Sequence, residues 1–127
     1  VKCGAPERPA ICFIGDAGFY YHSNEMTTAV KYGINTVTVL NNNHVMAQGL
    51  PNLTSFYPED RAKAVNRISY PAVSFTKIAE EMGMFAICVN KPEDIAPAIE
   101  KALKSERPAL VEVITYGDHK VPDPMEF

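Results

Sequence analysis

Residues 10–18, with the sequence AICFIGDAG, join a short apolar run to a turn that contains two glycines. An apolar run that is ended by Gly15 and Asp16 is typical of a strand buried on both faces of a sheet. Residues 25–33 then carry apolar side chains at helical spacing, and residues 36–40, TVTVL, are rich in β-branched side chains. This order predicts a βαβ unit, whose two strands run parallel and end at the same edge of the sheet.

The rest of the chain repeats the alternation of strands and helices. Ser74 is placed to cap a helix that Gly83 ends, and residues 84–89 form the third strand-like run. Asp94 is the expected N-cap of a further helix, and residues 108–114 form the fourth apolar run. We therefore predict one domain of the α/β class, with a mostly parallel open sheet and flanking helices.

Two parts of the sequence lack a regular pattern. Residues 44–73 contain Gly49, several prolines and no sustained period, so we expect an active-site loop region with at most one short helix near residues 61–65. Residues 115–127 contain Pro122 and Pro124 and are expected to form an irregular tail.

The charge balance argues against several classes of partner. The chain of 127 residues has 12 Lys and Arg against 15 Asp and Glu, a formal net charge of -3 at pH 7. This balance removes the main electrostatic reason to expect nucleic acid or an anionic membrane as a partner. No apolar stretch approaches the length of about 18 residues that a membrane span needs, so we expect a cytoplasmic protein. The three cysteines, Cys3, Cys12 and Cys88, lack the spacing of a metal site and are expected to be buried thiols.

Two polar residues follow neighbouring strands of the predicted sheet. Asp16 ends the first strand and Asn43 lies just beyond the second, so their side chains are expected to converge at one edge. A carboxylate and an amide oxygen suit Mg²⁺ or Ca²⁺, which would draw further ligands from phosphate. Backbone N–H groups of Ala17 and Gly18 could cradle the anion, and Gly15 and Gly18 would allow its close approach. Asp and Asn are also ordinary turn residues, and that interpretation stays open.

These residues are similar to the motif of enzymes that use thiamine diphosphate. Gly15-Asp16-Ala17, the helix with Glu25-Met26, and Asn42-Asn43 resemble the GDG…NN motif, with 27 positions from Asp16 to Asn43. The segments FTKIA (75–79), KPED (91–94) and RPALVEV (107–113) resemble the same proteins, so the similarity covers most of the chain. The acetolactate synthase-like group is the most similar.

The resemblance implies roles for individual residues. Asp16 and Asn43 would be side-chain ligands of Mg²⁺, Val45 would lend its backbone carbonyl, and Ala17 and Gly18 would donate to the diphosphate. Ala17 replaces the third glycine of the usual motif. The implied cofactor-binding residues are Gly15, Asp16, Ala17, Gly18, Asn43, Val45 and Met46, the last in a segment that closes over the cofactor in relatives.

The resemblance also implies an activity for a larger assembly. It suggests an enzyme that forms or cleaves C–C bonds of 2-oxo acids. One alternative is a 2-oxo acid decarboxylase or oxidase that uses the same cofactor. Apart from the resemblance, a noncatalytic flavodoxin-like cation-binding module is a further alternative. The activating glutamate would come from a pyrimidine-binding domain of the same or another chain in a homo-oligomer, and FAD, if needed, would bind another domain. Residues 1–127 would be the C-terminal part of the diphosphate-binding domain. They would be either a piece of a longer chain or a natural subunit of a split enzyme. Alone, they would be catalytically inert, and they would contain no catalytic residue.

Overall fold

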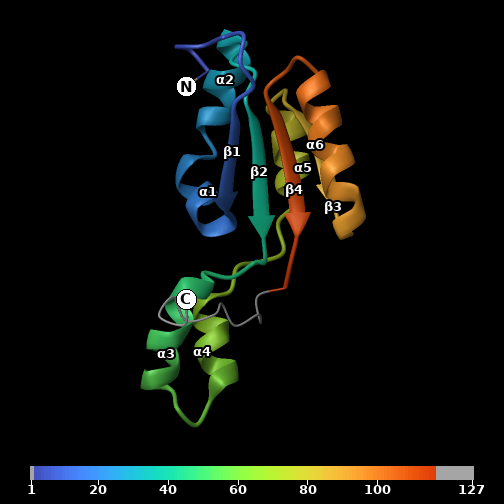
Figure 1. Ribbon diagram of the computed structural model, residues 1–127. Helices are drawn as coiled ribbons and strands as arrows, with labels where there is room; N and C mark the ends of the chain where they lie inside the picture. Colours follow the sequence, from blue (N-terminus) through green and yellow to red (C-terminus); the bar gives the residue numbers. More distant parts are fainter. Residues whose placement is uncertain (1, 117–127) are drawn as a thin grey trace, which may run out of the picture.

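The computed structural model describes residues 2–116, and in this part of the chain four strands form one sheet (Figure 1). The strand order is β1-β2-β4-β3, and every neighbouring pair is parallel. The prediction of an α/β fold with a mostly parallel open sheet is therefore confirmed. The strands are β1 (Ile11–Gly15), β2 (Val37–Asn42), β3 (Phe85–Val89) and β4 (Ala109–Ile114).

Helices cover the two faces of the sheet unequally. On one face, Phe19, Met26 and Phe75 of three helices bury the inward side chains Leu40 and Leu110. On the other face, α6 packs through Ala98 and Ala102 against β2, β3 and β4. The helices are α1 (Asp16–His22), α2 (Glu25–Tyr32) and α5 (Phe75–Glu81) on the first face, and α6 (Ile95–Lys104), preceded by the 3₁₀ turn η2 (Pro92–Asp94), on the second.

The expectation that the first strand is buried on both faces is wrong. β1 lies at the edge of the sheet, and the side chains of Ile11 and Phe13 are 53% and 74% exposed. Ile11 and Phe13 pair with Val37 and Val39, so they share the α6 face of the sheet. Because α6 packs on the other three strands, the apolar composition of β1 does not lead to burial here.

Residues 44–73 contain more helix than the sequence predicts. The 3₁₀ turn η1 (Ala47–Gly49) is followed by α3 (Leu50–Phe56) and α4 (Arg61–Ile68), where at most one short helix was expected. Figure 1 shows the two helices beyond the carboxyl ends of the strands. An antiparallel bridge between Val45 and Ser69 closes the base of this excursion.

Several smaller expectations can also be compared with the structure. The Ser74 side chain caps α5 by accepting the backbone N–H of Lys77, as predicted. The three cysteines are free and exposed, not buried as expected. Residues 117–127 of the predicted tail lie outside the described residues, and residues 115–116 are irregular. None of the helices between residues 2 and 116 has the length and apolarity needed to cross a bilayer.

Candidate functional site

The carboxylate of Asp16 lies at the carboxyl edge of the sheet and is held by two backbone N–H groups. Asp16 directly follows β1, begins α1 and is only 3% exposed. Its Oδ2 accepts the N–H of Asn43 at 3.1 Å, and its Oδ1 accepts the N–H of Ala17 at 2.6 Å. The structure therefore brings the Asp16 carboxylate and the Asn43 backbone together, whereas the predicted convergence of the two side chains on one point stays a prediction.

Asp16 is a buried carboxyl group whose hydrogen-bond donors between residues 2 and 116 are these two N–H groups. No lysine, arginine or histidine of that region pairs with its carboxylate. Burying a charge is costly unless an opposite charge or several hydrogen bonds compensate for it. Each carboxylate oxygen can accept more than one bond, so the group retains the capacity to bind a cation. A carboxylate oxygen is the kind of ligand that Mg²⁺ prefers.

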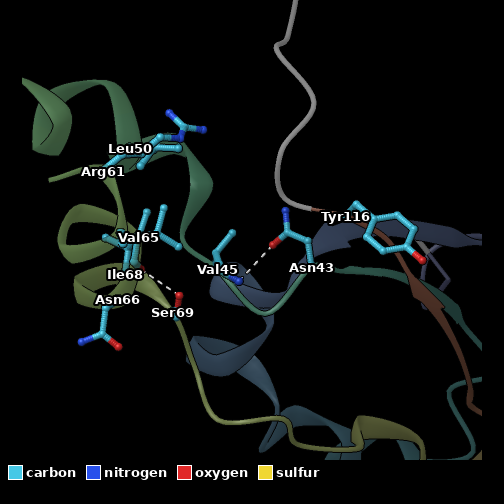
Figure 2. Close-up of a pocket in the computed structure, with 10 residues that line it drawn as sticks. Asn43, Val45, Leu50, Arg61, Val65, Asn66, Ile68, Ser69 and Tyr116 are labelled. Atoms are coloured by element: carbon cyan, nitrogen blue, oxygen red, sulfur yellow. Dashed lines mark hydrogen bonds between the residues drawn. The ribbon is translucent and has the colours of Figure 1, made fainter.

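The side chain of Asn43 organises the turn that follows β2. Its Oδ1 accepts the backbone N–H of Val45 at 3.1 Å, which closes an Asx turn (Figure 2). His44, inside this turn, has φ of +58°, in the left-handed region that few non-glycine residues adopt. The turn places the predicted ligands Asn43 and Val45 on the same short segment beside Asp16.

The predicted anion cradle takes the form of a helix rather than a tight turn. Ala17 and Gly18 lie in the first turn of α1, where backbone N–H groups have no partner within the helix. The N–H of Ala17 is already bonded to Asp16. A Cβ on Gly15 would meet no atom within 4 Å, whereas one on Gly18 would lie 3.2 Å from Ile14. Open space for an anion thus lies at Gly15, and Gly18 also serves the packing of α1 on β1.

A pocket of about 650 Å³ lies between this turn and the α3–α4 helices (Figure 2). Asn43 and Val45 form its wall on the side of the sheet. Met46 is 37% exposed, does not line the pocket, and donates its N–H to Ile68 at 2.9 Å. The remaining lining residues are Leu50, Arg61, Ala62, Val65, Asn66, Ile68, Ser69 and Tyr116.

Sequence reasoning missed Tyr70, which follows the α3–α4 excursion and bonds to the turn after β2. Its N–H donates to the carbonyl of His44 at 2.8 Å, and its ring lies 5.0 Å from the ring of Tyr20. Desolvation, followed by the negative charge of Asp16, raises the pKa of Tyr70 above its ordinary value. The sequence gives little signal for this residue, because it is separated from Asp16 by the whole α3–α4 excursion.

Sequence reasoning also missed Glu112, which is buried in β4 with 1% exposure. Its carboxylate accepts hydrogen bonds from Asn42 at 2.7 Å and from the Thr76 hydroxyl at 2.6 Å. A single acidic residue inside the apolar segment ALVEVI was the available signal. A buried carboxylate of this kind needs several donors, and the structure supplies them from β2 and α5.

Comparisons with known proteins give sequence relatives among enzymes. The chain is 32% identical to a sulfoacetaldehyde acetyltransferase of Alcaligenes xylosoxydans over 89% of its length, and 30% identical to the acetolactate synthase large subunit of Lactococcus lactis over 95%. These alignments cover 19% and 20% of the two relatives, so the chain spans about a fifth of their length.

A solved structure agrees with the sequence relatives. The chain superposes on the thiamine diphosphate-dependent 4-hydroxybenzoylformate decarboxylase of Rhodococcus jostii with a TM-score of 0.80 and 25% identity, over 94% of this chain and 22% of that one. Residues 1–113 also match the family model described as the C-terminal TPP binding domain of thiamine pyrophosphate enzymes, thiamine pyrophosphate being another name for thiamine diphosphate. This chain therefore belongs to the family of C-terminal thiamine pyrophosphate-binding domains.

Proposed function

We propose that this chain binds the Mg²⁺-diphosphate end of thiamine diphosphate in an enzyme that forms or cleaves C–C bonds of 2-oxo acids. The observation that supports this most is the buried Asp16 carboxylate, which two backbone N–H groups hold at the carboxyl edge of the sheet. In open parallel sheets, ligands bind at this edge. The acetolactate synthase relative supports the reaction class.

Each residue of the site has a proposed role. Asp16 and Asn43 contribute side-chain oxygens to Mg²⁺, and Val45 contributes its backbone carbonyl. Mg²⁺ prefers six oxygen ligands and usually keeps waters and substrate phosphates among them, so three protein ligands suffice. Backbone N–H groups at the start of α1 donate to the diphosphate, that of Gly18 directly and that of Ala17 by sharing its hydrogen between Asp16 and the diphosphate, with open space beside Gly15.

In this proposal the protein and the cofactor have different roles in the reaction. When bound, thiamine diphosphate supplies a nucleophilic thiazolium carbon, and the protein supplies binding, orientation and electrostatics. Residues 44–73, with α3 and α4, form the active-site region next to Asn43. Met46 contributes to cofactor binding from outside the pocket beside these helices. We assign no catalytic residue to this chain.

The remaining parts of the enzyme lie on other domains in this proposal. A pyrimidine-binding domain of the same or another chain contributes the activating glutamate, and the assembly is a homo-oligomer. FAD, if an oxidase reaction needs it, binds a separate domain. The chain spans about a fifth of its curated relatives, which is consistent with a part of a larger enzyme.

The experiment that tests this proposal is a titration of thiamine diphosphate, with and without Mg²⁺, on the full assembly that contains this chain. Saturable binding that requires Mg²⁺ and is lost in Asp16→Ala supports the proposal. Absence of saturable binding in the unaltered protein contradicts it, and that result is the one expected of a noncatalytic flavodoxin-like module.

A second candidate is a decarboxylase that uses the same cofactor, favoured by the structural similarity to the Rhodococcus decarboxylase. The two reactions differ in their products from pyruvate. A synthase joins two substrate molecules with loss of one CO₂, whereas a decarboxylase releases an aldehyde and CO₂ from each molecule. Oxygen consumption during turnover would instead indicate an oxidase.

A further inference from the structure

A buried carboxylate links the site edge of the sheet to helix α5. Glu112 lies within β4, and its Oε1 accepts the Asn42 side-chain N–H at 2.7 Å and the Phe75 N–H at 3.3 Å. Its Oε2 accepts the Thr76 N–H at 2.8 Å and the Thr76 hydroxyl at 2.6 Å. Three of these partners are N–H groups, and each Glu112 oxygen faces a backbone N–H, so an amide at this position would set its own N–H against a donor.

Asn42 carries this connection to the turn after β2. Its side chain is fully buried, and while its nitrogen donates to Glu112, its oxygen accepts the backbone N–H of His44 at 3.2 Å. Rotation of the Asn42 amide would break both bonds at once. Two hydrogen bonds therefore tie Glu112 to the backbone of His44, which has positive φ between Asn43 and Val45.

We propose that Glu112 is a positioning residue for the metal site. Through Asn42, it fixes the turn of residues 43–45 in the conformation that presents Asn43 and Val45 toward the cation at Asp16. The inference rests on the proposed function, because it assigns Glu112 a role toward the ligands named there. Residues that orient metal ligands without touching the metal commonly change metal affinity by about 10- to 100-fold when mutated.

Two variants that leave Glu112 itself unchanged separate positioning from general stability. Asn42→Leu has a similar shape and removes both bonds of the Asn42 amide, the one that it donates to Glu112 and the one that it accepts from His44. Thr76→Val also has a similar shape and removes the hydroxyl bond from Glu112 toward α5. Each variant deletes one hydrogen bond to the same buried carboxylate, so both are expected to lower thermal stability. Only Asn42→Leu interrupts the path to the metal ligands.

The experiment measures the Mg²⁺ dissociation constant at saturating thiamine diphosphate, by calorimetry on the full assembly, below the unfolding temperature of each variant. We expect Glu112→Gln and Asn42→Leu to weaken Mg²⁺ binding by about 10-fold or more, and Thr76→Val to bind like the unaltered protein.

Each outcome has a defined meaning. Unchanged Mg²⁺ affinity in Asn42→Leu overturns the positioning role, even if Glu112→Gln fails to fold. Equal losses in Thr76→Val and Asn42→Leu overturn it too, because the effect would then follow stability alone. Absence of Mg²⁺-dependent binding in the unaltered protein overturns the proposed function itself, and the positioning role with it.

Discussion

The Oδ2 of Asp16, at the end of β1, accepts the backbone N–H of Asn43, at the end of β2, at 3.1 Å. These residues are 27 positions apart in the sequence and meet because β1 and β2 are neighbouring parallel strands, with Gly15 in register with Asn41. The hydrogen bond holds a buried carboxylate against the turn that carries the other proposed ligands. The account of this chain depends on that juxtaposition.

Asp16→Asn keeps the size of the side chain and removes its charge. We expect the folded structure to persist, because the amide oxygen can still accept the N–H of Asn43. Mg²⁺ affinity should fall by more than about 10-fold, since even changes outside the ligand set commonly cost that much. Calorimetric titration of Mg²⁺ in the presence of thiamine diphosphate measures the change.

Asp60→Asn is the matched control for that substitution. Asp60 caps α4 by accepting the N–H of Lys63 at 2.8 Å, and its side chain is exposed. The same chemical change at this site should leave Mg²⁺ affinity unaltered. If both variants lose affinity equally, the loss reports a general loss of charge and not a ligand at Asp16.

Asn43→Ala removes the amide oxygen that closes the turn onto Val45. We expect Mg²⁺ affinity to fall because one ligand is lost and the turn relaxes. Asn41→Ala is the control: the amide of Asn41 accepts the Thr115 hydroxyl at 2.6 Å, so this variant also loses one hydrogen bond near the same edge. Equal affinities of the two variants for Mg²⁺ would argue against Asn43 as a ligand.

The unequal coverage of the sheet predicts unequal effects of truncating its side chains. Leu110 is fully buried, and Leu110→Ala should lower the free energy of unfolding by about 2–5 kcal/mol. Phe13 is 74% exposed, and Phe13→Ala should change it by less than about 0.5 kcal/mol. Urea unfolding of residues 1–127 measures both. A large decrease in the free energy of unfolding of Phe13→Ala would show that this face of β1 is covered.

Glu112 also affects the neighbouring Cys88, its partner in the β3–β4 register. Desolvation, followed by the Glu112 charge, raises the pKa of the Cys88 thiol, which a hydrogen bond with Thr76 partly offsets. The folded state thus favours the neutral thiol. Protonated Cys88 therefore stabilises the folded state below the ordinary thiol pKa, and this stabilisation is lost as the pH rises through the raised pKa.

This shift predicts how Cys88 reacts with iodoacetamide, since the thiolate is the reactive form. Peptide mass spectrometry measures the rate at which Cys88 is alkylated. This rate should rise at a higher pH than the alkylation rate of a thiol with an ordinary pKa. Glu112→Gln should move the rate profile toward lower pH. An unchanged profile in that variant would mean that the Glu112 carboxylate does not act on Cys88.

The sequence predicts best those elements that local chemistry determines. The β-branched segment before Asn41 forms β2, and Gly33 and Gly83 end their helices with φ of +60° and +91°. The proximity of Asp16 and Asn43 was also predictable, because parallel strands end at the same edge of a sheet. The family was suggested by a resemblance that rests on the motif from Gly15 to Asn43 together with the later segments, and the comparisons confirm it.

Other features depend on contacts that the sequence does not show. α1 contains Gly18 and three aromatic residues, which lower its intrinsic helix propensity, so it was not distinguished from a turn. α3 and α4 are short helices that pack on one another, and short helices show little periodicity. Glu112 meets Asn42 across 70 positions, a separation that no local pattern reports.

The most direct test of the central claim is a crystal structure of the full protein with Mg²⁺ and thiamine diphosphate bound. We predict one Mg²⁺ with an Asp16 carboxylate oxygen, the Asn43 amide oxygen and the Val45 carbonyl oxygen each at about 2.0–2.1 Å. A metal ion bound elsewhere, or one that contacts Asp16 while the Asn43 oxygen lies outside its coordination sphere, would contradict the account.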